Sequence, residues 1–365
     1  MRPSPAPAGT QAVRRVLGAA LLASPWVQRL GRISFLGTLD AHPQSKVRSS
    51  RLDHSLSVAR LGLEVAQAAR LPASERRHFV AACLLHDIGH YPLSHAAEPG
   101  FARGLGVAHH AVSEWLVRGT GPMGPAMSLR PTLAAAGLDA DAVWAIIAGD
   151  AAASRLAPLL HGPINLDTLD GIVRAARAFG LRGVRLPERL FHLQDGRPWI
   201  RAAAVPVVDR FWALKDRVYC RVINLPSNIV CEARMSEAVA RRYDRSIFTG
   251  FASFDDDALA ELLREHAAES GLTRGRDDAF RLDATPAAGE HLQRSRKRYF
   301  IDHSATPDER GLPLDRWARR YRHERQLRFL VPHDPAVQLS LPGLGGGRRS
   351  TRRGAAPLVS EEPEI

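Results

Sequence analysis

The sequence predicts a mainly α-helical fold: a helical bundle with additional C-terminal helices and one short β-hairpin. Apolar residues recur at three- and four-residue spacing along much of the chain, most clearly over 51–70, and this spacing is typical of amphipathic helices. The chain has 365 residues, 45% of them hydrophobic and 24% charged, which is an ordinary globular composition. It can therefore bury a large core.

Charge and cysteine content limit the classes of function. The formal net charge is +12, and this basic balance favours anionic partners such as nucleotides or nucleic acid. Nearly all of the positive charge is arginine, which with the many alanines indicates a GC-rich coding background. The three cysteines are far apart and fit neither a disulfide framework nor a metal-ligand spacing. No apolar run reaches the roughly 18 residues that indicate a membrane helix. We therefore expect a cytoplasmic protein without a membrane segment.

Composition shifts divide the chain into four parts. Residues 1–13 are rich in proline and are predicted to be a disordered leader. Residues 14–245 are the predicted core, and 246–335 are predicted to be a basic C-terminal helical region. Residues 336–365, which are rich in glycine and arginine, are predicted to be a disordered tail.

Helical spacing and its interruptions predict the order of the elements. Helices are expected at 14–36, with a break at Pro25, and then at 51–70, 72–87, 107–118, 139–147, 165–179, 202–225, 226–243 and 248–264. A short β-hairpin is expected over 186–199, because Asp195-Gly196 is a favoured two-residue turn.

The stretch 83–95 concentrates metal-ligating side chains. His86 and Asp87 offer an imidazole nitrogen and a carboxylate oxygen from adjacent positions, which suits a divalent metal ion. Consecutive residues of a helix project about 100° apart, so both side chains reach one ion only near a helix end. Gly89 and Pro92 follow at once and predict such an end.

Two further ligands are expected from other helices. His54 lies on the amphipathic helix ahead of His86, and two antiparallel helices would bring both imidazoles together. Asp167, at the start of the helix 165–179, is the candidate for the fourth ligand. The alternative interpretations are that His54 is a structural residue of its helix and that Asp167 only caps the next one.

Three motifs stand out along the chain: Arg51-x-x-His54-Ser-Leu, then Leu85-His86-Asp87-Ile-Gly89-His90-x-Pro92-x-Ser94-His95, then Asp167-x-x-Asp170. Together they resemble the HD-domain phosphohydrolases, and within that superfamily the deoxynucleoside-triphosphate triphosphohydrolase branch. A later element, His109-x-x-x-Ser113, resembles a further motif of that branch. The resemblance extends from about Trp26 to Met235.

The resemblance implies a water-activating divalent metal ion held by four side chains: His54, His86, Asp87 and Asp167. It implies three histidines that contact phosphate oxygens or transfer a proton: His90, His95 and His109. It also implies that Arg51 is a fixed cation facing the phosphates. The residue types agree with this chemistry, because a divalent ion neutralises phosphate and histidine can donate a proton near neutral pH. Such a ligand set accommodates Mn, Mg, Fe, Ni or Zn.

Five positions depart from the pattern of that branch. Thr168, Gly171 and Ala175 stand where the branch has a lysine, a tyrosine and a further aspartate. Phe35 falls near the glutamine that contacts the sugar 3′-hydroxyl, and His110 replaces a glutamate. We therefore expect intact metal and phosphate contacts, lost deoxyribose contacts and a pocket widened at Gly171. A phosphomonoester, a modified nucleotide and a nucleic-acid end are all admissible substrates.

These features support two hypotheses about function. The first is a metal-dependent phosphohydrolase that acts on a nucleotide-type phosphate ester or anhydride. The alternative is a catalytically weak or inactive nucleotide sensor or scaffold that docks on nucleic acid or on a partner protein. Histidines beyond the metal ligands favour the enzyme, because a structural metal site needs no proton donors.

The C-terminal part of the sequence indicates further partners. The basic segments 294–298 and 316–328 adjoin or contain aromatic residues, a combination that contact with DNA would need, and the alternative is a solvated helix face. Gln338–Leu344 begins with a pattern that resembles the peptide by which bacterial replication and repair proteins bind the sliding clamp. The family resemblance also implies a homo-oligomer.

Overall fold

The computed structural model describes residues 8–162, 164–187, 189–240, 245–269, 280–283, 292–301, 307–314 and 321–332. The chain divides into a compact unit, Met1–Pro332, and a second segment, His333–Ile365, which lies outside the described residues. The predicted tail 336–365 and the peptide Gln338–Leu344 therefore stay predictions.

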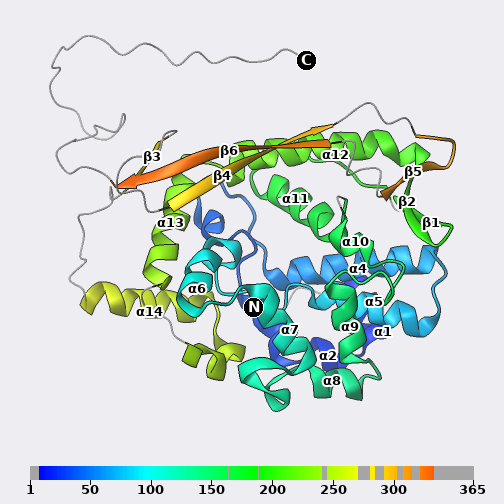
Figure 1. Ribbon diagram of the computed structural model, residues 1–365, viewed down its shortest axis with the longest axis horizontal. Helices are drawn as coiled ribbons and strands as arrows, with labels where there is room; N and C mark the ends of the chain where they lie inside the picture. Colours follow the sequence, from blue (N-terminus) through cyan, green and yellow to red (C-terminus); the bar gives the residue numbers. More distant parts are fainter. Residues whose placement is uncertain are drawn as a thin grey trace, which may run out of the picture. The chain divides into compact units, whose positions relative to one another are not determined.

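The described residues form a mainly α-helical fold, as predicted (Figure 1). The first helices are α1 (Ala8–Leu17), α2 (Ala19–Leu22), α3 (Pro25–Arg29), α4 (Arg51–Ala68), α5 (Ala73–Leu85), α6 (Glu98–Leu105) and α7 (His109–Arg118). The later ones are α8 (Arg130–Ala135), α9 (Ala140–Ile147), α10 (Pro158–His161), α11 (Leu166–Ala178), α12 (Val205–Val218), α13 (Pro226–Ala240) and α14 (Asp256–Glu269). The helices predicted between residues 51 and 179 are confirmed, with small shifts at their ends, whereas α6, α8 and α10 are not among the predicted helices.

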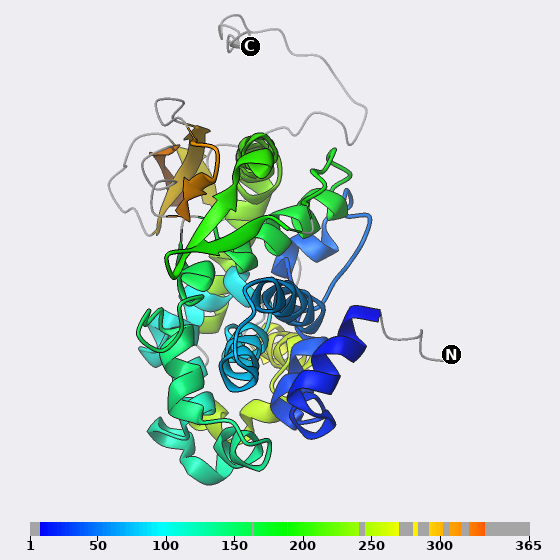
Figure 2. The same cartoon turned by 90° about the vertical axis from the view of Figure 1, so that its right-hand side faces the viewer.

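Helices α4 and α5 lie side by side at the centre of the fold (Figure 2). Every residue of α5 from Phe79 to Leu85 is fully buried, as expected of a helix in the interior. Gly62 allows α4 to approach it, because a Cβ atom at this position would lie only 2.6 Å from the Cys83 sulfur. The C-terminal end of α5 is therefore fixed against α4.

Helix α4 begins with a capping box. The Ser50 hydroxyl accepts a hydrogen bond from the Asp53 amide at 3.1 Å, and the Asp53 carboxylate accepts one from the Ser50 amide at 2.9 Å. This reciprocal arrangement stabilises a helix start. It sets Arg51 at the first helical position, one turn before His54.

The predicted hairpin is confirmed. Strand β1 (Phe191–Gln194) pairs antiparallel with β2 (Arg197–Arg201), and a third strand, β5 (Gly311–Pro313), pairs with β2. Asp195 and Gly196 have φ angles of 52° and 72°. A two-residue hairpin turn requires such left-handed residues.

The predicted leader 1–13 needs correction at its end, because α1 begins at Ala8. Val13 and Leu17 of this helix are fully buried in the core, and this burial stabilises a helix that composition alone does not indicate. The helix predicted over 14–36 is then divided, since α1 ends before Gly18, whose φ angle is 88°.

The region 246–335, predicted to be helical, is only partly so. A 3₁₀ segment (Arg245–Ser253) and α14 are followed by an antiparallel sheet in the order β3–β6–β4. Its strands are β3 (Phe280–Asp283), β4 (Leu292–Ile301) and β6 (Tyr321–Pro332). Aromatic and β-branched residues near the end of β4 favour a strand over a helix.

The basic residues of this region lie on neighbouring strands. Arg294 pairs with Arg328, and Lys297 pairs with Arg325, across β4 and β6. The alternative of a solvated helix face is therefore wrong for these residues, whereas 315–320 lie outside the described part. Within the part of the chain that the structure describes, no helix combines the length and hydropathy needed to cross a bilayer.

Asp40 is a buried acid in the connection between α3 and α4. It belongs to the 3₁₀ turn Gly37–Ala41 and is 6% exposed. Its Oδ2 atom accepts a hydrogen bond from the Leu36 amide at 3.2 Å, whereas Oδ1 has no partner among the described residues. Burial raises the pKa of Asp40 to about 6.

We expect Asp40→Asn to stabilise the protein above pH 6. Because the pKa of Asp40 is higher in the folded state than its ordinary value, the native protein binds this proton more tightly and loses stability as the pH rises towards 6. The uncharged variant keeps an acceptor for the Leu36 amide. It should gain about 1–3 kcal/mol near pH 8 and much less near pH 4.5, as measured by thermal unfolding.

The control for this prediction is Asp257→Asn, which removes the same charge from an exposed position. An equal gain of the Asp40 variant at both pH values would show that ionisation of the buried carboxyl is not the cause.

Candidate active site

Two histidines from neighbouring helices face the same carboxylates. His54 lies on α4 and is fully buried, and His86 is the C-cap of α5. His54 Nδ1 lies 2.7 Å from Asp170 Oδ2, and His86 Nδ1 lies 2.9 Å from the Cys83 carbonyl oxygen. Because both partners are acceptors, Nδ1 is the donor in each ring, so Nε2 is the atom that is left to bind a cation.

Two carboxylates complete this group. Asp87 Oδ2 lies 3.6 Å from His54 Nε2 and 3.5 Å from His86 Nε2, and Asp167 Oδ1 lies 3.1 Å and 3.9 Å from the same two atoms. The side chain of Asn165 caps α11, so Asp167 is not the cap, and its carboxylate is left for the site. The structure thus brings together all four predicted metal ligands.

These residues fit a divalent cation. The Nε2 atoms of His54 and His86 are buried and have no partner in hydrogen-bonding geometry among the described residues. Burial lowers the pKa of His54, but the carboxylates of Asp167 and Asp170 outweigh burial and raise it to about 9. The carboxylates therefore attract positive charge to this point, and two imidazole nitrogens with two carboxylate oxygens are a donor set for a divalent metal.

Arg51 is a buried cation beside this group and is 3% exposed. Its guanidinium donates to Asp87 Oδ2 at 2.6 Å, to Ser94 Oγ at 2.7 Å and to the Phe35 carbonyl at 3.3 Å. Burial acts to raise the pKa of Asp87, but neighbouring histidines and Arg51 outweigh it and hold this pKa well below its usual range. Asp87 is therefore a carboxylate anion.

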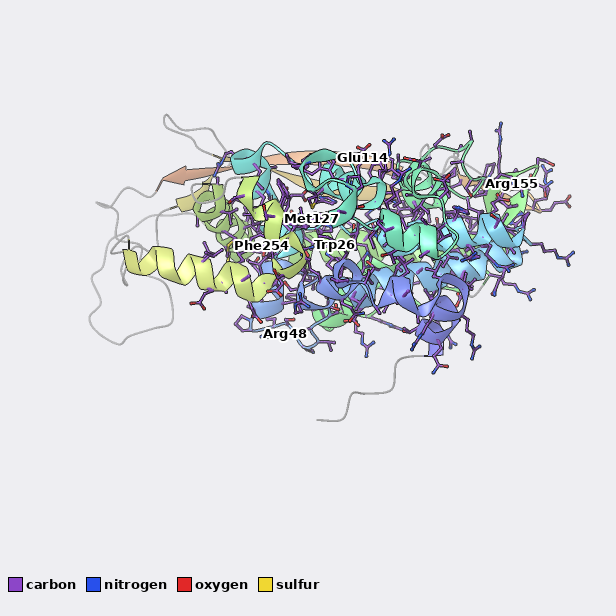
Figure 3. The ribbon with its side chains drawn as sticks, turned by 90° about the horizontal axis from the view of Figure 1, so that it is seen from below. Trp26, Arg48, Glu114, Met127, Arg155 and Phe254 are labelled. Atoms are coloured by element: carbon purple, nitrogen blue, oxygen red, sulfur yellow. The ribbon has the colours of Figure 1, made fainter. Side chains whose placement is uncertain are left out.

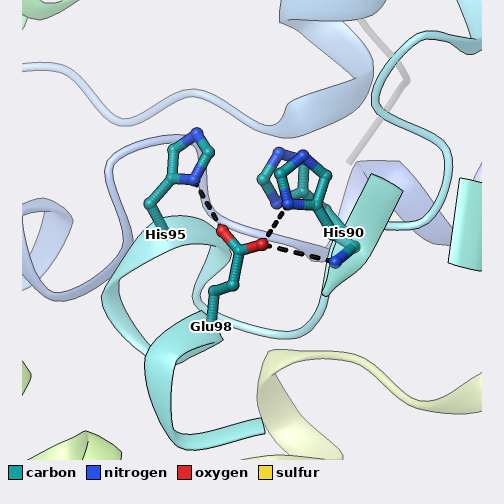
Figure 4. A group of neighbouring side chains, drawn as sticks. His90, His95 and Glu98 are labelled. Atoms are coloured by element: carbon teal, nitrogen blue, oxygen red, sulfur yellow. Dashed lines mark hydrogen bonds and ion pairs between the residues drawn. The ribbon is translucent and has the colours of Figure 1, made fainter. Parts of the chain in front are cut away.

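A second group, three histidines around Glu98, lies next to the first (Figure 4). Glu98 Oε2 lies 3.0 Å from His95 Nδ1, and Oε1 contacts His109 Nδ1. The His90 ring stacks on the His109 ring with centroids 4.0 Å apart, and its centroid is 4.6 Å from that of His95. His90 Nε2 lies 3.3 Å from Asp87 Oδ1, so the two groups share Asp87.

The three histidines differ in exposure. His90 is fully buried and His109 is 5% exposed, whereas the side chain of His95 is 64% exposed. Burial and the charge of Arg51 lower the pKa of His90 well below its usual range, so this ring is neutral near pH 7. Burial acts to raise the pKa of Glu98, but hydrogen bonds from His109 and His95 outweigh it and hold this pKa below its usual range.

Close packing of α7 sets the position of His109. The Gly89 amide donates to Ser113 Oγ at 3.0 Å. A Cβ atom at Gly89 would lie 2.3 Å from the Ser113 amide nitrogen and 2.4 Å from the His109 carbonyl oxygen. Any side chain at position 89 would therefore push α7 and His109 away from the loop that follows Asp87.

A cavity of about 400 Å³ opens beside both groups. Asp167, Arg51 and His95 contribute to its wall. The other lining residues are Phe35, Leu36, Leu39, Ala96, Thr168, Gly171, Ile172, Ala175, Lys215, Val218, Tyr219, Ile223 and Glu232. The cavity is thus apolar over much of its wall, which also includes one candidate ligand, Asp167, together with Arg51 and His95.

Four of the positions that depart from the resembled branch line this cavity: Phe35, Thr168, Gly171 and Ala175. A Cβ atom at Gly171 would lie 3.3 Å from Phe35 Cζ, so Phe35 restricts the space beside Gly171, and the expectation that Gly171 widens the pocket stays a prediction. The Phe35 ring fills the adjacent space. Its centroid lies 4.7 Å from that of the His54 ring and 4.7 Å from Arg51 Cζ.

Glu98 and Asp170 belong to the site, although no role was predicted for either. Glu98 stands three residues after His95, and Asp170 stands three residues after Asp167. Residues at this spacing lie on one face of a helix. In the sequence, an acid three residues after a candidate site residue was therefore the feature that could have indicated both Glu98 and Asp170.

Residues 51–121 match the HD domain family. This HD-domain segment supplies His54, His86 and Asp87 and also contains His90, His95, Glu98 and His109. Asp167 and Asp170 lie beyond it, on α11.

Two solved structures share the fold. A phosphohydrolase from Bacteroides thetaiotaomicron aligns with a TM-score of 0.55 at 18% identity, over 74% of this chain and 76% of that chain. A hypothetical protein from Aquifex aeolicus aligns with a TM-score of 0.63 at 16% identity, over 86% of this chain and 92% of that chain. No curated protein gives a significant sequence match. At these identities the likeness concerns the fold alone.

We expect Asp170→Asn to weaken the binding of Mn²⁺ by about 10- to 100-fold, because the carboxylate that orients His54 through Nδ1 is lost. Isothermal titration calorimetry measures this. Asp141→Asn, which changes an exposed acid on α9, is the control. An unchanged affinity of the folded Asp170 variant would contradict the orienting role.

Proposed function

We propose that the protein is a metal-dependent phosphohydrolase that acts on a nucleotide-type phosphate ester or anhydride. The observation that carries this proposal is the juxtaposition of four candidate metal-ligating side chains with the His95–Glu98 pair, beside a cavity whose wall includes Asp167, Arg51 and His95. The match of residues 51–121 to the HD domain family supports it.

A divalent ion held by His54, His86, Asp87 and Asp167 would supply Lewis acidity, which neutralises phosphate oxygens and lowers the pKa of the water that it binds. His95 is open to the cavity, and Glu98 fixes its ring, so His95 is the group placed to give a proton to the leaving oxygen. Arg51 adds a fixed positive charge in the wall of the same cavity.

The substrate class follows from the cavity. Asp167, Arg51 and His95 in its wall suit a metal-bound phosphate, and the largely apolar rest of this cavity of about 400 Å³ suits a base and a sugar. Phe35 and Gly171 offer the sugar no side-chain hydrogen bond. We therefore propose that the enzyme discriminates weakly between ribose and deoxyribose.

We expect the protein to release phosphate, pyrophosphate or triphosphate from at least one nucleotide when Mn²⁺ or another divalent ion is present. The panel contains dNTPs, NTPs, monophosphates and short oligonucleotides. The preference between a dNTP and its NTP should stay below about 100-fold, because only buried hydrogen-bonding complementarity gives 10⁴- to 10⁵-fold discrimination.

His86→Ala is the negative control for this panel, since it removes a ligand atom and should abolish turnover together with metal binding. Tight nucleotide binding without turnover of any substrate by the wild type would contradict the enzyme and favour the alternative of a nucleotide sensor. A dNTP preference above 10⁴-fold would contradict the weak discrimination of sugars.

We expect His95→Gln to lower kcat by about 10²- to 10⁴-fold, the usual contribution of a general acid. Metal affinity should not change, because His95 is not a ligand of the first group. His192→Gln on β1, away from the cavity, is the matched control. A kcat within threefold of the wild type would exclude His95 as the proton donor.

A further inference from the structure

The loop that carries His95 has an unfavourable backbone conformation. Leu93 and Ser94 have φ angles of 56° and 53°, so two consecutive residues with side chains lie in the left-handed region. Residues other than glycine rarely adopt it and remain there only when surrounding contacts impose it. These two lie directly before His95.

A carboxylate from the C-terminal part of the chain holds this loop. Asp256, the first residue of α14, accepts a hydrogen bond from the Leu93 amide through Oδ1 at 2.7 Å. Its Oδ2 atom accepts one from the Ser34 amide at 2.8 Å. One side chain therefore joins two segments that are distant in sequence, one leading to Phe35 and the other to Ser94.

The same two segments hold Arg51. Ser94 Oγ donates to the Ser34 carbonyl at 2.6 Å and accepts from Arg51 Nε at 2.7 Å. The neighbouring Phe35 carbonyl accepts from Arg51 Nη2. The position of the Arg51 guanidinium therefore depends on the contacts between residues 34–35 and 93–94.

A second contact holds the start of the loop. Arg29, on α3, is fully buried and donates to the His90 carbonyl and to the Phe254 carbonyl, both at 2.7 Å. Its guanidinium lies 4.0 Å from the centroid of the Phe251 ring. Helix α3, which carries Trp26, packs on the segment that leads to Phe254 (Figure 3). The segment 251–256 is thus linked to both ends of the stretch from His90 to Leu93. Arg29 joins Phe254 to His90, and Asp256 contacts Leu93 directly.

We propose that Asp256 is a positioning residue of the site, which keeps Leu93 and Ser94 left-handed so that Ser94 orients Arg51 and His95 faces the cavity. This inference rests on the proposed function. Asp256 touches neither the metal ligands nor the cavity wall, so its action passes through the loop.

The test compares Asp256→Asn with Asp257→Asn in the full-length protein. The two variants remove the same charge from adjacent positions of α14, and Asp257 is exposed. An asparagine side chain has one acceptor oxygen, so it cannot accept from both the Leu93 and Ser34 amides. We expect amide hydrogen exchange of Leu93 or Ser34 to become about tenfold faster in Asp256→Asn only. We also expect kcat to fall about 10- to 100-fold, with Mn²⁺ affinity unchanged.

A second variant separates positioning from general destabilisation. Glycine adopts left-handed angles without support, so adding Leu93→Gly to Asp256→Asn should restore part of kcat although it removes a packed side chain. A double variant slower than Asp256→Asn would overturn the proposal, as would unchanged exchange and kcat in Asp256→Asn. The exchange measurement needs no substrate, so absence of turnover in the wild type would refute the proposed function and leave the effect of Asp256 on the loop measurable.

Discussion

The site depends on the burial of one carboxylate. Asp87 is 6% exposed, and a buried anion is tolerated only when its oxygens are paired. Its Oδ2 atom faces Arg51 and the Nε2 atoms of His54 and His86, and its Oδ1 atom faces His90. Asp87 therefore belongs to both groups of the site. The guanidinium of Arg51 and the three imidazoles compensate the charge of Asp87. They are also the residue types that metal and phosphate chemistry requires.

The scaffold keeps these groups in place through contacts with little tolerance. Gly62 lets α4 approach Cys83, whose carbonyl oxygen orients His86. Gly89 lets the loop that follows Asp87 approach α7, which carries His109. Both approaches leave no room for a Cβ atom. Close packing of this kind transmits small shifts. The imidazoles of His86 and His109 are therefore positioned by the packing of the helices as much as by their hydrogen bonds.

The sequence was sufficient for the parts of the site that are encoded locally. His86 and Asp87 are adjacent at a helix end, and His54 and Asp167 lie at predictable positions on amphipathic helices, so the four candidate ligands that the structure brings close together could be named, and their role as ligands stays a prediction. Pairing across long sequence distances could not be predicted. The contacts of Asp256 with Ser34 and Leu93 depend on tertiary packing, and the strands β4 and β6 pair residues of a region that local charge made appear helical.

Phe35 and Gly171 illustrate why a motif departure must be read in three dimensions. Taken alone, glycine at position 171 predicts empty space, and phenylalanine at position 35 predicts a lost hydrogen bond. In the structure the Phe35 ring lies against Gly171, and it packs on both His54 and Arg51. A cation over an aromatic ring and a buried imidazole beside it are favourable contacts. Phe35 therefore offers no polar side-chain contact to a sugar but packs against two residues of the candidate site, so a departure from a motif can belong to the scaffold that positions that site.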